Sequence, residues 1–196
     1  MVLYLSIVII SMTIIAGLNI LLGVFGYSPL EVVGLVCFSV LCEIVIDLIF
    51  AGISESFPKK WVSPECKIYQ VGKKERKFYE KIGIKKWKDK VLELGILAGF
   101  RKNKIKDKNS PEYLYRFMVE SNKGINTHIL NIVFGFLVIF CIPLKYWLVI
   151  SVPVAVVNAF LGLLPVLILR YNIPKLRVAY ERAVRLQKQK ETTNEI

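Results

Sequence analysis

Histidine and cysteine are scarce in this chain. Its 196 residues include one histidine, His128, and four cysteines, none of which forms a Cys-x-x-Cys pair. Zinc and related transition-metal sites need several such ligands close together, so we expect no metal site of this kind. Cys37, Cys42 and Cys141 lie in apolar stretches and Cys66 in a basic one, which is no disulfide framework. We interpret Cys37 and Cys42 as small apolar core residues.

Acidic residues are also few, 15 against 27 lysines and arginines, which leaves a net charge of +12. No helix-turn-helix, zinc or RNA-binding signature accompanies this charge, which argues against nucleic acid as the partner. Attraction to anionic lipid headgroups explains a basic surface equally well. We therefore expect membrane lipids as partners.

Long apolar runs dominate the rest of the chain. At about 1.5 Å of rise per residue, a run of about 20 residues crosses a hydrocarbon core of roughly 30 Å. The first run could instead be a signal peptide, but it lacks a basic start and is longer than such segments. We predict an all-α membrane protein with four transmembrane helices in two hairpins. The four runs are residues 2–25, a run from Pro29 to 53, residues 126–143 and residues 146–169.

The basic residues predict the orientation of these spans. Nineteen of the 27 lie between Ser54 and Asn126, and seven more lie from Arg170 onward. Basic segments stay on the cytosolic side, so we expect a multi-pass cell-membrane protein with both termini and the central segment in the cytosol. The expected parts are an N-terminal hairpin (1–53), a basic interfacial segment (54–125), a second hairpin (126–169) and a basic tail helix (170–196).

The central segment interleaves apolar patches with lysine. The patches around Phe78 and Trp87 fit amphipathic helices that lie in the membrane interface. Residues 91–100 are too short to span, so they are a candidate re-entrant or surface-buried piece. Residues 102–110 predict a loop, and a helix is expected to begin with Ser110 as N-cap and Pro111 as its first residue.

Two acids, Glu43 and Asp47, lie inside the second apolar run. Their spacing of four places them on one helix face. Ionisable groups at this depth usually face the bundle interior or a wet cavity. The structural alternative is that they hydrogen-bond a polar side chain of another helix.

A pocket is expected near the cytosolic ends of the spans. His128 is the candidate base there, although a lone interfacial histidine can also be satisfied by a backbone carbonyl. Glu120 lies about 12 Å before it along a continuous helix, too far for direct contact unless Gly124 bends the helix. Arg170, just before Pro174 is expected to end the helix, serves as a membrane anchor or as a clamp for an anion. The remaining candidates for this pocket are Glu43, Asp47, Asn131, Tyr171 and Asn172.

Three blocks of this sequence resemble the glycosyl-4,4'-diaponeurosporenoate acyltransferase family of bacterial membrane proteins. They are the Trp-Lys-Asp block (Tyr79–Asp89), the Glu-to-His block (Glu120 and His128) and the Arg-Tyr-Asn-x-Pro block (Arg170–Leu176). The resemblance covers roughly residues 78–176. It implies an enzyme that esterifies a sugar hydroxyl of a glycosylated carotenoid with a fatty acyl chain. This chain differs from the family's named member in having a fuller N-terminal hairpin with Glu43 and Asp47, so its acceptor can differ as well.

Acyl transfer to a hydroxyl suits the residues at hand. His128 can remove the hydroxyl proton, oriented by Glu120 or Asp47. Arg170 and Asn172, with the lysines around Trp87, can neutralise an oxyanion or the phosphates of a donor. Trp87, Lys88 and Asp89 are further candidates for substrate binding. We expect no bound cofactor, an acyl thioester such as acyl-CoA as the donor and a lipid-linked acceptor. No Gly-x-Ser-x-Gly sequence is present, which favours direct transfer over a serine intermediate.

Two other functional classes compete with acyl transfer. A four-span protein with basic interfacial helices also suits a non-enzymatic lipid-binding or assembly subunit. Glu43 and Asp47 also suit the proton carriers of a small transporter, for which four spans are few unless the protein forms a homo-oligomer. A transporter would depend on the carboxylates, an acyltransferase on His128.

Overall fold

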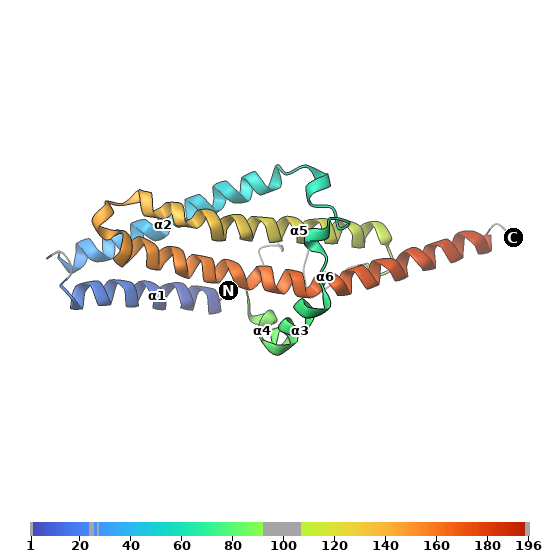
Figure 1. The fold of residues 1–196 in the computed structure, drawn as a ribbon, viewed down its shortest axis with the longest axis horizontal. Coiled ribbons are helices and arrows are strands. Elements are labelled where there is room, and N and C mark those ends of the chain that lie inside the picture. The colour runs from blue at the N-terminus through green and yellow to red at the C-terminus, as the bar shows by residue number, and fades with distance from the viewer. Residues whose placement is uncertain (1, 24–25, 27, 92–106, 195–196) are drawn as a thin grey trace. The chain divides into compact units, whose positions relative to one another are not determined.

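The computed structural model describes residues 2–23, 26, 28–91 and 107–194, and within these the chain is helical, with no strand. The predicted all-α fold is confirmed. The predicted re-entrant piece, residues 91–100, and most of the predicted loop lie outside the described residues. The α-helices are α1 (Val2–Leu21), α2 (Pro29–Glu55), α3 (Lys73–Lys81), α4 (Ile84–Trp87), α5 (Pro111–Phe134) and α6 (Val152–Asn194) (Figure 1).

Four helical stretches are long and apolar enough to cross a membrane, as predicted, so the chain is a multi-pass membrane protein. The third begins earlier than the apolar pattern suggested, because α5 is unbroken from its polar first half into its apolar second half. A tight 3-10 segment, Gly135–Cys141, then continues it. The four stretches are Tyr4–Leu21, Pro29–Glu55, Pro111–Cys141 and Leu144–Thr193.

Polar caps determine where α2 and α5 begin. Ser28 accepts from the backbone of Glu31, and the Glu31 carboxylate accepts from the backbone of Ser28, so the two form a capping box before Pro29. The predicted cap of α5 is confirmed, since the Ser110 hydroxyl accepts from the backbone N–H of Tyr113 at 3.2 Å. Each cap satisfies N–H groups that a helix start leaves without partners.

The expectation that Pro174 ends the last helix is wrong. Helix α6 runs for 43 residues with both Pro165 and Pro174 inside it. A proline inside a helix leaves the carbonyl four residues earlier without its donor. For Pro165 that carbonyl belongs to Leu161, and the hydroxyl of Tyr4 on α1 donates to it at 2.5 Å. A neighbouring helix therefore supplies the hydrogen bond that the proline removes.

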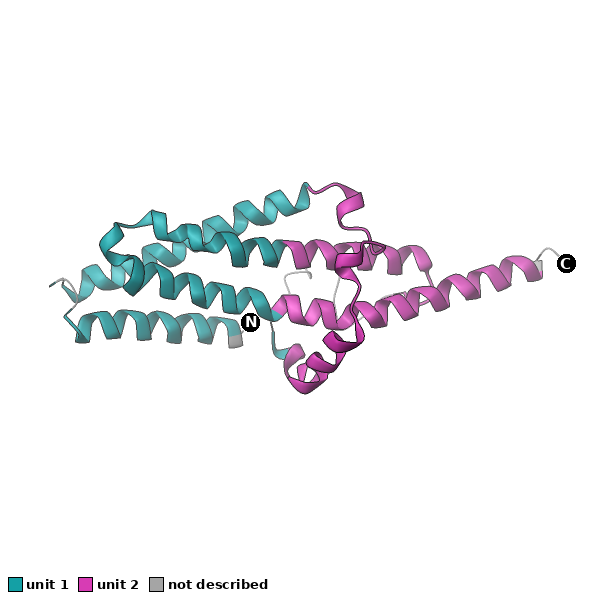
Figure 2. Cartoon of the chain, viewed as in Figure 1, with its two compact units in different colours: residues 1–56, 90–92, 127–164 teal, residues 57–89, 93–126, 165–196 magenta. Residues whose placement is uncertain are grey.

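The chain divides into two compact units, shown in Figure 2. Unit 1 comprises residues 1–56, 90–92 and 127–164 and is built from α1, α2 and the apolar parts of α5 and α6. Its core includes Ile15, Val32, Val36, Ile150 and Val154. Its outer surface remains apolar, as expected where lipid surrounds the helices: Leu5, Ile9, Leu41, Leu48 and Leu148 are all more than half exposed.

The cysteines are placed differently from the expectation of a core role. Cys37 is exposed on α2 and Cys42 is only half-buried. An apolar thiol is tolerated on the outside of a helix when that outside faces hydrocarbon, which explains why the expectation fails.

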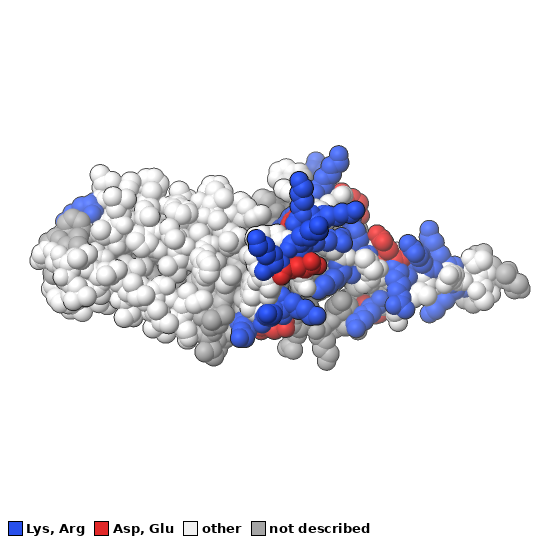
Figure 3. Space-filling model, turned by 60° about the horizontal axis from the view of Figure 1, so that its bottom comes forward, with Lys and Arg blue, Asp and Glu red and all other residues white. Residues whose placement is uncertain are grey.

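Unit 2 comprises residues 57–89, 93–126 and 165–196 and holds α3, α4 and the polar parts of α5 and α6. Phe117 and Met118 of α5 pack with Leu176 of α6, and Tyr115 and Tyr180 lie against this cluster. Lysine and arginine side chains gather over this unit (Figure 3). The basic residues of the sequence thus concentrate on one unit, and the apolar runs on the other.

Close packing of α5 and α6 in unit 1 depends on Gly162. A Cβ atom there would lie 3.0 Å from Cγ1 of Ile132 and 3.7 Å from the carbonyl oxygen of His128. Small residues let membrane helices approach closely, and here the approach occurs beside the candidate base.

We expect Gly162→Leu to lower the thermal stability of the detergent-solubilised protein, because forcing a larger side chain into a packed contact costs about 1–3 kcal/mol. Thermal unfolding followed by circular dichroism measures the effect. Gly17→Leu is the matched control, since nothing lies within 4 Å of a Cβ at Gly17. Equal melting temperatures for the two variants would contradict the packing described here.

Candidate functional site

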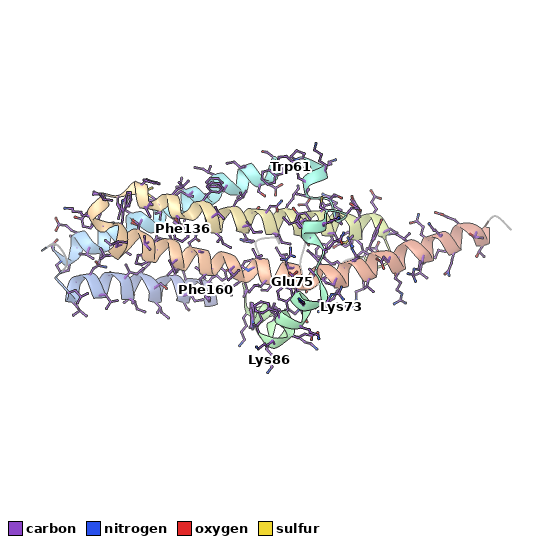
Figure 4. All side chains as sticks on the ribbon, viewed as in Figure 1. Trp61, Lys73, Glu75, Lys86, Phe136 and Phe160 are labelled. Carbon is purple, nitrogen blue, oxygen red and sulfur yellow. The ribbon has the colours of Figure 1, made fainter. Side chains whose placement is uncertain are left out.

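Arg170 of α6 makes several hydrogen bonds within unit 2. Its guanidinium donates two hydrogen bonds to Glu75 of α3, from Nε to Oε1 at 2.6 Å and from Nη2 to Oε2 at 3.0 Å. Its Nη1 donates to the carbonyl of Ile68 at 2.8 Å. The two side chains are 19% and 28% exposed, so water only partly screens the pair. Arg170 therefore fastens α3 to α6, and Figure 4 labels Glu75 where this contact forms.

Two tyrosines extend this contact. The hydroxyl of Tyr79, buried on α3, donates to Glu75, and its ring meets Tyr171 of α6 edge to face with centroids 6.2 Å apart. Lys175 lies over the ring of Tyr171, 4.0 Å from its centroid. This Arg170 cluster joins the first and third family-like blocks, because Tyr79 begins one and Arg170 and Tyr171 begin the other.

The network changes the acid–base character of its members. Hydrogen bonds from Arg170 hold the pKa of Glu75 below its ordinary value. Burial, followed by the hydrogen bond to Glu75, raises the pKa of Tyr79 well above its ordinary value. At neutral pH the cluster is therefore an ionised Arg170–Glu75 pair beside a neutral phenol.

The Trp-Lys-Asp block forms a corner in the same unit. Gly83 adopts a left-handed conformation, φ 63°, between α3 and α4. The indole N–H of Trp87 donates back across this corner to the carbonyl of Ile82 at 3.2 Å. Lys88 and Asp89 form an adjacent ion pair at 3.7 Å, with Asp89 59% exposed. Trp87 thus has a local structural role, and the charged pair lies at the surface.

The segment before α3 is held against α5 by buried polar groups. Asn122 donates to the carbonyl of Val62 at 2.9 Å. The Tyr69 hydroxyl lies 3.0 Å from the carbonyl of Trp61 and 2.9 Å from Oδ1 of Asn126. These contacts place residues 57–69 on α5, and Arg170 places residues 68–81 on α6.

The Glu-to-His block lies along α5. Glu120, half-buried in unit 2, pairs with Lys123 at 3.4 Å. His128 is half-buried in unit 1, and its backbone carbonyl lies at the close approach to Gly162. Asn131, one turn further, is buried, and its Oδ1 has no hydrogen-bond partner in the described part of the chain. Within unit 1, the candidate base and an amide oxygen without a partner thus lie one turn apart on α5.

Glu43 and Asp47 share a helix face, as their spacing predicted, and both accept from one amide. Nδ2 of Asn158 on α6 lies 2.6 Å from Oε1 of Glu43 and 3.1 Å from Oδ1 of Asp47. Gly135 makes this possible, because a Cβ there would lie 2.5 Å from Oε1 of Glu43. The two acids therefore hydrogen-bond a polar side chain of another helix, which is the structural alternative named from the sequence.

The residues expected to share one pocket fall into two groups. Glu43, Asp47, His128 and Asn131 belong to unit 1, whereas Arg170, Tyr171 and Asn172 belong to unit 2 with Glu120 and Trp87–Asp89. The sequence analysis did not name two residues of these contacts, Asn158 and Glu75. Asn158 is an amide in an otherwise apolar run, and that pattern could have indicated a polar contact inside the membrane. Glu75 is one acid among many lysines, and no comparable pattern marks it.

Four apolar helical stretches and a basic polar unit define the class, a multi-pass membrane protein with a charged extramembrane part. Residues 58–182 match the CrtO family, glycosyl-4,4'-diaponeurosporenoate acyltransferase, and the chain belongs to this family. The predicted resemblance is confirmed, and the matched range contains all three blocks. No curated protein and no solved structure matches the chain significantly.

The Arg170–Glu75 pair predicts a stability that depends on pH. A lowered folded-state pKa means that ionised Glu75 stabilises the fold above its ordinary pKa, and that this contribution is lost as acid protonates it. We expect thermal stability to fall between pH 7 and pH 3. In Glu75→Gln we expect lower stability at pH 7 and a smaller further loss in acid.

Hydrogen exchange of residues 73–81 measures this effect locally. Glu80→Gln serves as the control, because Glu80 is an exposed acid on the same helix. If Glu75→Gln keeps the acid dependence of the wild-type protein, the pair does not hold α3 on α6.

Proposed function

We propose that this protein transfers a fatty acyl chain from a thioester donor to a sugar hydroxyl of a glycosyl carotenoid or a related lipid-linked acceptor. The family match over residues 58–182 carries the proposal, because the family is named for acyl transfer to a glycosyl carotenoid. The contact between the first and third blocks at the Arg170 cluster supports it, since family-like residues far apart in sequence meet in one unit.

The reaction exchanges one acyl bond for another. The acceptor hydroxyl attacks the thioester carbonyl, an ester bond forms, and the carbon–sulfur bond breaks. The hydroxyl proton passes to a base and from there to the departing thiolate. The enzyme must therefore supply a base, donors for the transient oxyanion and a surface for the donor's polar end.

His128 is our candidate base. It is the only imidazole in the chain, and histidine is the side chain that most often acts as a general base. Asn131, with a buried Oδ1 that has no partner among the described residues, is available one turn away to accept from a substrate hydroxyl. Glu120 and Asp47 remain candidates to orient His128.

The basic surface of unit 2 is our candidate for holding an anionic donor such as acyl-CoA. Helices α3 and α4 carry several lysines, among them Lys73 and Lys86, which Figure 4 labels in the same part of unit 2 as Glu75. Arg170 itself is bidentate to Glu75 and would bind a phosphate only by releasing it, so its first role is to position α3. Asn172 and Lys88 are further candidates for donor contacts.

We expect His128→Ala to insert and fold normally yet lose acyl transfer by roughly 10²–10⁴-fold, the usual contribution of a general base. Transfer of a radiolabelled acyl chain to a glycosyl carotenoid in membranes measures it. Ile129→Ala is the control, because Ile129 is 40% exposed on the neighbouring position of α5. An inserted, fully active His128→Ala protein would remove His128 from the mechanism.

We propose that unit 2 and both termini face the cytosol, because segments rich in lysine and arginine favour that side of a membrane. In a variant without its native cysteines, we expect Lys145→Cys to react with a membrane-impermeant maleimide added to intact cells. Lys67→Cys should react only after the cells are opened. Both positions are exposed, so accessibility of the side chain does not limit either reaction. The reverse pattern would place the proposed site on the other side of the membrane.

A further inference from the structure

Unit 1 contains a cavity of about 130 Å³ between α1, α2 and α6. Its wall is apolar over most of its extent, with Val8 and Met12 from α1, Val40 and Ile44 from α2, and Val154 and Val157 from α6. Glu43, Asp47 and Asn158 also line it and give it a polar end. The cavity thus has the features of a small-molecule site, an apolar pocket with a few convergent polar groups.

The polar end is incompletely satisfied. Asn158 donates to one oxygen of each carboxyl group. Glu43 is only 4% exposed, and its second oxygen, Oε2, has no hydrogen-bond partner among the residues that the structure describes. A buried polar atom without a partner is costly and calls for an explanation. Because Glu43 lines the cavity, a ligand there that carries a hydrogen-bond donor would meet this carboxyl group.

The chemistry of the wall selects the ligand. Among the described residues no lysine or arginine lines the cavity, so an anionic ligand would meet two carboxyl groups with no cation to balance its charge. A neutral hydroxyl, in contrast, can donate to Glu43 or Asp47 without bringing a charge into a membrane span. An engineered apolar cavity of about 150 Å³ holds benzene, so this cavity accommodates a short hydrocarbon segment.

We propose that this cavity is a binding site for an aliphatic alcohol, with the hydrocarbon against the apolar wall and the hydroxyl hydrogen-bonded to the Glu43–Asp47 pair. Neither His128 nor Arg170 is among the residues that line the cavity, although Asp47, a candidate to orient His128, does line it. Helices α1 and α2, which supply most of the wall, lie outside the residues that match the family. Two of the three helices that form the site thus lie outside the family match, whereas Asn158 and the rest of the α6 wall lie within it.

Photolabelling of the purified protein in detergent tests the proposal without any acyl donor. The probe is an octanol that carries a diazirine on its chain, and the matched probe is its methyl ether, which keeps the hydrocarbon but cannot donate a hydrogen bond. We expect the alcohol to label α1 near Met12 and α6 near Val157, about two- to tenfold more than the ether, the effect of one hydrogen bond. Equal labelling by the two probes, or labelling elsewhere, would overturn the proposal.

A pair of variants tests the location. Val157→Phe fills the cavity and should abolish alcohol labelling, whereas Val156→Phe, at a neighbouring position that is 52% exposed, should leave it unchanged. Undiminished labelling of a folded Val157→Phe protein would exclude this cavity as the site. If Val157→Phe does not fold, the comparison of alcohol and ether on the wild-type protein decides alone. Because only binding is measured, the result is independent of whether His128 catalyses acyl transfer.

Discussion

The hydrocarbon core of a membrane offers no water, so the backbone N–H and C=O groups inside it must find their partners within the protein. This constraint explains the contacts of unit 1. The carbonyl that Pro165 leaves without a donor is met by Tyr4, and a carbonyl of the irregular turn of helix at Trp147–Ser151 is met by the Asn19 amide at 3.0 Å. In the same unit one amide, Asn158, serves two carboxyl groups. The apolar helices are thus held together by close packing, as at Gly162, and by a small number of polar contacts, because lipid does not reward hydrophobic burial.

Unit 2 carries most of the charged side chains, and an ion pair joins two of its helices. Here a bidentate arginine–carboxylate pair, Arg170 with Glu75, joins α3 to the polar part of α6, and Tyr79 and Tyr171 pack around it. Arginine suits this role better than lysine because its planar fork matches a carboxylate. Residues of the first and third blocks thus contact one another, as Tyr79 and Tyr171 do. Their positions explain how a short lysine-rich segment with little apolar surface of its own keeps a defined structure.

The two units suit different parts of the substrates in the proposed reaction. Substrates of the proposed reaction have long apolar chains and polar ends, and the two units have matching chemistry. Unit 1 contributes apolar helices and the candidate base His128, and unit 2 contributes the cations. Helices α5 and α6 belong to both units, so the chain itself links the two kinds of surface.

The amino-acid sequence by itself determined the elements that depend on local pattern. Apolar run length predicted four spans, the Ser110–Pro111 pair predicted the start of α5, and the spacing of Glu43 and Asp47 predicted a shared face. These succeed because hydropathy, caps and helical periodicity act between residues close in the chain. Tertiary structure alone decided that Pro174 lies inside α6, that Asn158 joins the acids and that Arg170 binds Glu75. The last two pairings join residues about a hundred positions apart. The chain contains many lysines, acids and amides of similar chemistry, so the sequence does not show which of them meet.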